Sequence, residues 1–308
     1  MSRNLFYCSE LSRRAAEKRY GTASIGAVWL LIEYPQAWGP HALRDSALSP
    51  TVKGHLNHLL KTIPRSRLLF IKQEPGAKER LKLFVVRSRE SDPFIVKFEL
   101  DQHEDLLEID VAAAAAGNLS AGGIMTREQS LFLVCTHGKR DKCCAKFGYP
   151  LYKSLRALNP SVWQSSHVGG DRFAANLVCF PHGLFYAHVT EESSHRIIEE
   201  YEARRVVLDK YRGRACYSYP VQAAEYFIRR EAGVTGLDDL RQLGCERVNE
   251  RTWRARFIAA DGEKIHEAMV RTVMSDFQNY TTCHSTEEKN VIQYVLEDYR
   301  VADVHQQT

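Results

Sequence analysis

The sequence predicts an α/β protein, and three observations support that fold class. Up to Val189, short apolar runs bounded by turn residues alternate with segments whose apolar residues recur at helical spacing. The chain has 308 residues, 44% of them hydrophobic and 26% charged, which is an ordinary globular composition with room for two domains or more. The longest purely apolar stretches, such as Gly26–Ile32 and Val111–Ala116, are far shorter than the roughly 20 residues that span a bilayer, so no membrane helix is expected.

The first part of the chain is predicted to be an N-terminal α/β domain over residues 1–122. Its elements come in the order strand, helix, strand, strand, strand, and we expect them at Ala27–Glu33, Val52–Lys61, Leu68–Gln73, Leu81–Arg87 and Phe94–Leu100. Gly117–Gly123, which contains glycine and serine and no apolar period, is the candidate linker that closes it.

A second domain is predicted over residues 123–214. We expect its strands and helices at Leu131–Val134, Leu151–Leu158, Val162–Gln164, Asn176–Phe180, Leu184–Val189 and Ser193–Lys210, the last capped by Ser193 or Ser194. This order of strand, helix, three strands and helix is that of a thioredoxin-like fold. Because the first domain shows nearly the same order, it is interpreted as a degenerate second copy.

The remaining residues, 215–308, are predicted to form a C-terminal α+β appendage. We expect a helix at Val221–Glu231, a hairpin over Glu246–Ile258 and a helix at Glu263–Val273. The appendage contains no recognisable chemical motif.

Charge and cysteine content narrow the function classes. The formal net charge is only +4 with the two signs interleaved, so neither nucleic acid nor a membrane surface is an expected partner. The N-terminus has no apolar signal core, which favours the cytoplasm, and eight cysteines scattered over this length do not form a secreted disulfide framework. The solitary ones are expected to be small buried hydrophobes, namely Cys8, Cys179, Cys216, Cys245 and Cys283.

The closely spaced cysteines indicate a candidate metal site. Cys135 follows a predicted buried strand, and Cys144 is expected on the loop that comes after it. Farther on, His167 and Asp171 flank the pair Gly169-Gly170, which would let the backbone approach a bulky cofactor. Two thiolates and an imidazole form a soft donor set, which suits zinc or an iron–sulfur cluster better than calcium or magnesium.

The spacing favours a cluster over structural zinc. Zinc sites commonly use C-x2-C pairs, whereas the gap between Cys135 and Cys144 is eight residues and Cys143 is directly adjacent to Cys144. A long gap suits a cluster that offers two irons for ligation. Within the gap, Arg140 and Asp141 are expected to form a solvated ion pair that braces the loop.

These stretches resemble the sucrase/ferredoxin-like family, which includes fungal thioredoxin-like ferredoxins. The resemblance covers roughly the first 225 residues, and the segments that carry it are Tyr7–Glu10, Gly21–Gly39, Cys135–Leu151, Trp163–Val189 and Arg212–Ala224. It implies a [2Fe-2S] cluster held by two cysteines and two histidines. Position by position, the thiolates are Cys135 and Cys144 and the first imidazole is His167, while the second imidazole is replaced by Asp171.

The resulting hypothesis is an electron-transfer or redox-sensing protein with Cys135, Cys144, His167 and Asp171 as ligands of a [2Fe-2S] cluster. Its redox partner, a protein or a flavin reductase, is unknown. Cys143, His137 and His182 are the other candidates for the fourth ligand. Two alternatives stay open, a metal-free thiol oxidoreductase that uses Cys143-Cys144 or Cys135, and a structural zinc module.

Overall fold

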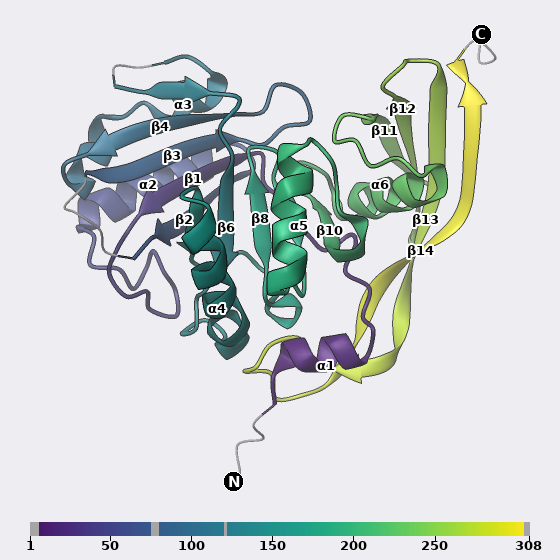
Figure 1. Ribbon diagram of the computed structural model, residues 1–308, viewed down its shortest axis with the longest axis horizontal. Coiled ribbons are helices and arrows are strands. Elements are labelled where there is room, and N and C mark those ends of the chain that lie inside the picture. The colour runs from purple at the N-terminus through teal and green to yellow at the C-terminus, as the bar shows by residue number, and fades with distance from the viewer. Residues whose placement is uncertain (1–5, 75–79, 120–121, 305–308) are drawn as a thin grey trace.

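The structure is a computed structural model and describes residues 6–74, 80–119 and 122–304. It confirms the α/β class: a mixed ten-stranded sheet is flanked by helices, and a separate antiparallel sheet of four strands follows in the C-terminal part (Figure 1). The predicted linker is only partly covered, because residues 120–121 lie outside the described ranges.

One half of the large sheet comes from the first part of the chain. Its elements are β1 (Val28–Glu33), α2 (Pro50–Thr62), β2 (Ser66–Lys72), β3 (Leu81–Arg87), β4 (Phe94–Leu100), a 3₁₀ turn η1 (His103–Glu108), α3 (Val111–Ala116) and β5 (Ile124–Thr126). The expected strands and helix are all present. Ser49 begins α2 by accepting a hydrogen bond from the Val52 N–H at 3.4 Å, and Leu56 and Leu59 bury the apolar face of the helix.

The other half comes from the middle of the chain. Its elements are β6 (Leu131–Cys135), α4 (Lys142–Leu158), β7 (Val162–Ser165), η2 (Asp171–Phe173), β8 (Leu177–Phe180), β9 (Leu184–Tyr186), α5 (Glu191–Glu202), η3 (Leu208–Lys210) and β10 (Tyr211–Arg214). Every residue of β6 is buried, as expected for a central strand.

The two halves repeat one topology. In the first, β1 runs parallel to β2 and antiparallel to β3, which gives the order β2-β1-β3-β4 with β5 at the edge. In the second, β6 runs parallel to β7 and antiparallel to β8, which gives β7-β6-β8-β9 with β10 at the edge. Antiparallel pairing of β2 with β7 joins them into one sheet. The expected repeat is therefore visible in the strand order, although the two sequences are not visibly similar.

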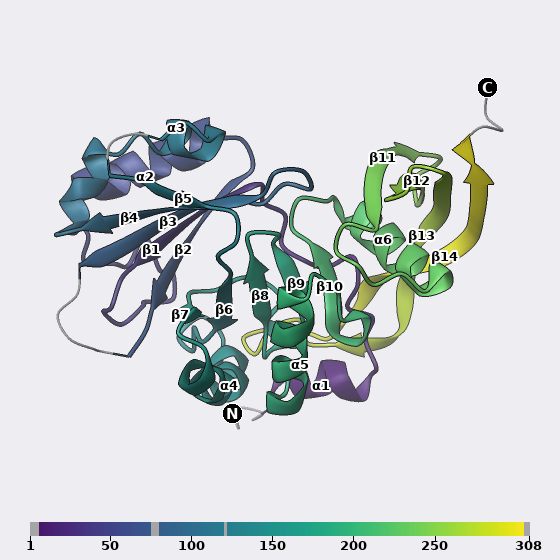
Figure 2. The same cartoon turned by 45° about the horizontal axis from the view of Figure 1, so that its top comes forward.

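A shared core connects the halves. Trp29 and Leu31 of β1 and Leu133 and Cys135 of β6 belong to one buried cluster, because alternate residues of each strand face it. Figure 2 shows the halves at an angle, with α2 and α3 over one and α4 and α5 over the other. Cys135 therefore lies in the core that the two halves share.

Two helices of the second half differ from prediction. Cys144 was expected on a loop, but α4 already starts at Lys142, because the Asp141 side chain caps it by accepting from the Cys143 N–H at 2.9 Å. The helix then continues through Pro150.

The charged helix α5 is shorter than expected. It starts after Thr190, whose hydroxyl accepts from the Ser193 N–H while the Ser193 hydroxyl accepts from the Thr190 N–H, and it ends at Glu202 rather than Lys210. Ser193 is therefore inside the capping motif and is not the cap.

The C-terminal part contains α6 (Tyr219–Ala232) packed on β11 (Leu240–Arg247), β12 (Thr252–Ala259), β13 (Lys264–Asn279) and β14 (Lys289–Asp303). The predicted helix at Glu263–Val273 is wrong. That segment lies in β13, where His266, Ala268 and Val270 are buried at every second position and β12 pairs along it. The long β13–β14 hairpin reaches back to a short N-terminal helix, α1 (Cys8–Arg14), which sequence reasoning missed (Figure 1).

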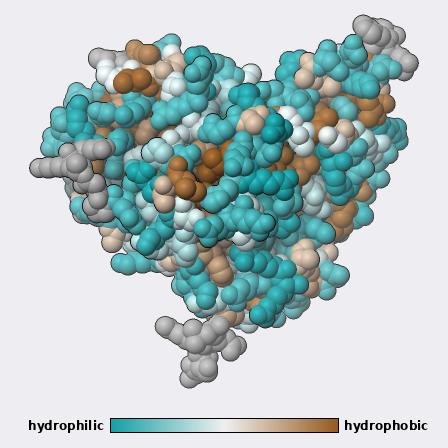
Figure 3. All heavy atoms as spheres, viewed as in Figure 1, coloured by the Kyte–Doolittle hydropathy of each residue, from teal (hydrophilic) through white to brown (hydrophobic). Residues whose placement is uncertain are grey.

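The surface and the helix lengths agree with the composition. In the view of Figure 3 the surface is largely hydrophilic, with hydrophobic residues scattered over it. Across the described ranges, the helices are too short or too polar to cross a membrane.

Candidate metal centre

The end of β6 and the first turn of α4 bring two thiols together. Cys135 is the last residue of β6, and its N–H donates to the Asn176 carbonyl oxygen at 3.2 Å. The helix packs tightly on this strand end at Gly148, where a Cβ would overlap the Cys135 carbonyl oxygen. As a result the Cys144 sulfur, the Cys135 sulfur and a ring nitrogen of His167 all lie within 4.8 Å of one another.

His167 is held in place by its loop. Its backbone N–H donates to His137 Nδ1 at 3.2 Å, and His137 Nε2 in turn donates to the Gly39 carbonyl oxygen at 2.7 Å. Both ring nitrogens of His137 are therefore occupied, which argues against this residue as the fourth ligand.

The glycine pair after His167 adopts a backbone conformation that brings its loop close to other parts of the protein. Gly169 and Gly170 have φ values of 89° and 80°, which L side chains rarely adopt. The space above them is filled by Ser24 and Arg212, and a Cβ on Gly170 would come within 2.5 Å of the Arg212 guanidinium. On the side where Cβ atoms would lie, the glycines therefore fit the loop closely against Ser24 and Arg212.

Arg212 is the buried residue that holds this loop. It donates to the Gly169 carbonyl oxygen at 3.0 Å, to Asn176 Oδ1 at 2.8 Å and to the Thr22 carbonyl oxygen at 2.5 Å. Burial lowers the pKa of Arg212 to about 9. The structure offers it no carboxylate hydrogen-bond partner among the described residues, so its donors are satisfied by the backbone and by neutral side chains.

Asp171 lies beside the other three donors. Its Oδ1 is 3.0 Å from His167 Nδ1 and 3.6 Å from the Cys144 sulfur, and the residue is buried. It falls outside the compact set formed by Cys135, Cys144 and His167. The next residue, Arg172, pairs with the buried carboxylate of Glu17 at 2.5 Å and not with the site.

The electrostatics separate the protonation states of these groups. Interaction with Cys144, and then with His167, holds the pKa of Cys135 well below its usual range, although burial opposes this. The pKa of Cys144 is raised by Cys135 and by burial. Burial alone would lower the pKa of His167, but contacts with Asp171 and Cys135 outweigh it and raise the value to about 9. The site therefore favours one thiolate next to an imidazolium, with the Asp171 carboxylate 3.0 Å from Nδ1 of the ring.

Two further candidates for the fourth ligand are placed elsewhere. His182 lies in the β8–β9 turn, beyond the β8 residue that pairs with the start of β6, so the whole length of β6 separates it from Cys135. Its Nδ1 accepts from the Tyr201 hydroxyl at 2.6 Å. The Cys143 sulfur points to a different group of side chains and does not join Cys144.

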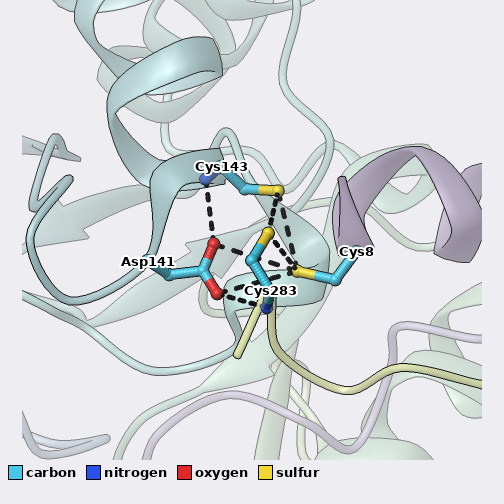
Figure 4. A group of neighbouring side chains, drawn as sticks. All are labelled: Cys8, Asp141, Cys143 and Cys283. Carbon is cyan, nitrogen blue, oxygen red and sulfur yellow. Dashed lines mark hydrogen bonds between the residues drawn. The ribbon is translucent and has the colours of Figure 1, made fainter. Parts of the chain in front are cut away.

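That second group was missed from the sequence. Cys8 and Cys283 are solitary in the sequence, yet their sulfurs meet Cys143 and Asp141, from positions 135 and 140 residues away from Cys143 (Figure 4). Asp141, expected in a solvated ion pair, is fully buried here. Of the other solitary cysteines, Cys179 is buried as expected, Cys216 is partly exposed, and Cys245 is exposed, contrary to expectation. No local spacing indicates these long-range contacts.

Comparison with known proteins confirms the family that the sequence resembles. The family model described as sucrase/ferredoxin-like matches residues 19–213. A curated relative, altered inheritance of mitochondria protein 32 of the yeast Meyerozyma guilliermondii, is 32% identical over 95 residues, which cover 27% of this chain and 34% of that protein. No solved structure matches the chain. Because the family match includes both halves of the large sheet and all four predicted donors, the chain belongs to the sucrase/ferredoxin-like family.

Proposed function

We propose that Cys135, Cys144, His167 and Asp171 hold a [2Fe-2S] cluster and that the chain is an electron-transfer or redox-sensing protein. The observation that carries this proposal is the convergence of two thiols and an imidazole within 4.8 Å, with a carboxylate 3.0 Å from that imidazole. Membership of a ferredoxin-like family supports it.

The donor set fits the group chemically. Cysteine thiolates are the usual ligands of such clusters, and in Rieske-type centres two imidazoles replace two of the thiolates on one iron. The cluster would supply one-electron transfer. The low pKa of Cys135 favours a thiolate there before metal binds, whereas Cys144 and His167, whose pKa values are raised, would release protons as metal binds.

The surrounding residues orient and shield the donors. His137 fixes the backbone of His167, and Arg212 fixes the glycines that follow. Cys135 and Cys144 are buried, while the side chain of His167 is 22% exposed. The histidine edge is therefore where we expect a redox partner, a protein or a flavin reductase, to approach. We propose the cytoplasm as its location, because its eight scattered cysteines do not form a secreted disulfide framework.

The test is a visible spectrum of anaerobically purified protein together with iron and sulfide analysis. We expect about two irons and two sulfides per chain. Cys135→Ser and Cys144→Ser should each abolish the colour. Cys143→Ser is the matched control, because it changes the neighbouring thiol in the same helical turn and its sulfur lies in the other group.

Other outcomes would contradict the proposal. A colourless Cys143→Ser protein alongside a coloured Cys144→Ser protein would show that the wrong thiol was assigned. A colourless wild type with zinc bound through Cys135 and Cys144 would indicate a zinc module. A metal-free wild type with a reactive dithiol would indicate a thiol oxidoreductase.

A further inference from the structure

Three cysteines and one aspartate from distant parts of the chain form a second buried group, here called the Cys8 group (Cys8, Asp141, Cys143 and Cys283). Cys8 begins α1, Asp141 caps α4, Cys143 lies in the first turn of α4, and Cys283 lies in the turn between β13 and β14 (Figure 4). Each residue offers a donor atom within 4.8 Å of the others. None of the four belongs to the centre proposed above.

The sulfur positions match one small ion. Cys143 lies 3.2 Å from Cys283 and 3.6 Å from Cys8, and Cys283 lies 3.6 Å from Cys8. Around a tetrahedral zinc ion with bonds of about 2.3 Å, ligand sulfurs stand about 3.8 Å apart. The triangle is therefore nearly equilateral and only slightly smaller than the face of such a tetrahedron. Both Asp141 oxygens lie 3.9 Å from the Cys8 sulfur, so a carboxylate oxygen is at hand as the fourth donor.

The backbone already orients these donors. Asp141 Oδ1 accepts from the Cys143 N–H at 2.9 Å, and Oδ2 accepts from the Cys283 N–H at 2.7 Å. Each oxygen keeps a lone pair for an ion, and ligating carboxylates are commonly held by such hydrogen bonds. The Ser9 N–H donates to the Cys143 sulfur at 3.5 Å, which favours the thiolate.

Charge also calls for a cation. Without one, three thiols and a carboxylate with donor atoms within 4.8 Å of one another cannot all ionise. The nearby Lys142 and Lys146 lie over the Tyr7 ring, at 4.9 and 4.1 Å. They offset negative charge from outside but donate no hydrogen bond into the group. A divalent cation would neutralise it from within.

We propose that Cys8, Cys143, Cys283 and Asp141 bind one zinc ion. The ion would tie the N-terminal helix and the C-terminal hairpin to the first turn of α4, and thus close the chain ends over the helix that also carries Cys144. Zinc fits better than a redox metal, because the set offers tetrahedral sulfur and oxygen donors and leaves no open position.

The experiment measures zinc and iron in the full-length protein purified anaerobically from zinc-supplemented medium. We expect about one zinc per chain in the wild type. Cys283→Ser should lower zinc retention by about tenfold or more while keeping the iron. Cys135→Ser should do the reverse, so failure of this site and failure of the proposed cluster are distinguishable. Cys245→Ser is the matched control, because this cysteine is exposed on β11 of the same C-terminal sheet and should change neither metal.

Three results would overturn the zinc site. The first is a wild type that carries no zinc and takes up none on titration with Zn²⁺. The second is a chain 2 Da lighter by intact mass than the reduced form, with Cys143 and Cys283 joined as a disulfide. The third is extra iron and sulfide that disappear in Cys283→Ser. If Cys283→Ser does not fold, Cys8→Ala and the Zn²⁺ titration of the metal-free wild type give the same decision.

Discussion

The two halves of the large sheet share one topology, yet the four donors of the proposed cluster all lie in the second. In that half, residues 136–141 connect β6 to α4 directly, and the helix starts with Cys143 and Cys144 in its first turn. In the first half, residues 34–49 form a much longer connection from β1 to α2, and the helix starts with Pro50, Thr51 and Val52. A duplicated fold therefore does not duplicate the site, because the donors depend on one short loop and one helical turn.

The half without donors supports the other one. Its long connection places Gly39 where its carbonyl oxygen accepts from His137, and it places the Trp38 ring edge-on to His137 with centroids 5.6 Å apart. His137 in turn positions His167. The long connection of the first half is thus part of the scaffold around the donors in the second.

The largest expected effect comes from adding one methyl group to α4, the helix of the second half. Gly148→Ala would drive a Cβ into the Cys135 carbonyl oxygen, push α4 off β6 and separate Cys144 from Cys135. We expect a loss of about 3 kcal/mol or more of unfolding free energy, together with loss of iron. Urea unfolding and iron analysis measure both.

Gly54→Ala is the matched change in the first half. Gly54 is exposed on α2 and has nothing within 4 Å of its Cβ position, so alanine should stabilise the protein by about 0.5–1 kcal/mol and leave the iron unchanged. Equal effects of the two variants would show that α4 is not held against β6 in the way described.

Sequence patterns predicted the local part of this architecture. The bounds of β3 and β4 were found to the residue, because short apolar runs between turn residues are a local signal. The segment around Ile265, Ala268 and Met269 fits helical spacing as well, and only its pairing with β12 and β14 decides that it is a strand. Tertiary pairing of this kind leaves no mark within a window of ten residues.

The candidate sites also differ in whether local sequence signals could predict them. Cys135, Cys144, His167 and Asp171 could be selected, because they lie close in sequence and in a family motif. The Cys8 group could not, since the Cys8 and Cys283 sulfurs meet across 275 residues and only the folded β13–β14 hairpin brings Cys283 to α1. Likewise the role of the glycine pair became clear only once Arg212 was placed above it.

A smaller effect is expected from the buried arginine of the second half. Arg212→Lys keeps the charge but cannot reach Gly169, Asn176 and Thr22 together. Unpaired buried acceptors should lower the unfolding free energy by about 1–3 kcal/mol and speed the release of iron to a chelator. Arg67→Lys is the control in the first half, because its guanidinium lies over the Trp29 ring at 5.6 Å, a contact that an ammonium can also make. If both variants release iron at the same rate, Arg212 does not position the loop.

Variants of Asp171 should change the cluster more than the fold. Asp171→Ala should lose iron, whereas Asp171→His should retain it. Replacing an anion by a neutral donor favours the reduced state, so the potential of Asp171→His should rise by an amount on the order of 100 mV. Redox titration of wild type and Asp171→His measures the shift. Full iron content in Asp171→Ala would remove this carboxylate from the ligand set.

A difference in pH dependence is expected between the equivalent hairpin turns of the two halves. In the first half, the turn between β3 and β4 carries Asp92 in exposed ion pairs with Arg87 and Arg127. In the second, the turn between β8 and β9 carries the buried His182. Burial, with further repulsion from Arg214 and Arg204 that outweighs attraction to Asp238, lowers the pKa of His182 to about 3.

A depressed histidine pKa makes the unfolded state the better proton acceptor. Below the unfolded value of about 6.5, the unfolded chain gains a proton at this residue that the folded protein does not, so stability falls as the pH falls toward 3. Between pH 6.5 and 5, His182 therefore lowers the unfolding free energy by about 2 kcal/mol. His188 is also buried, its pKa is likewise lowered to about 3, and it adds a similar loss. His182→Asn should therefore be less stable than wild type at pH 7, because the hydrogen bond with Tyr201 is lost, but should lose about 2 kcal/mol less on acidification. Urea unfolding at pH 7 and pH 5 gives the four free energies. The control is His58→Asn, which changes an exposed histidine on α2 and should show the same change of unfolding free energy with pH as the wild type. If His182→Asn shows that same change, His182 takes up a proton in the folded state.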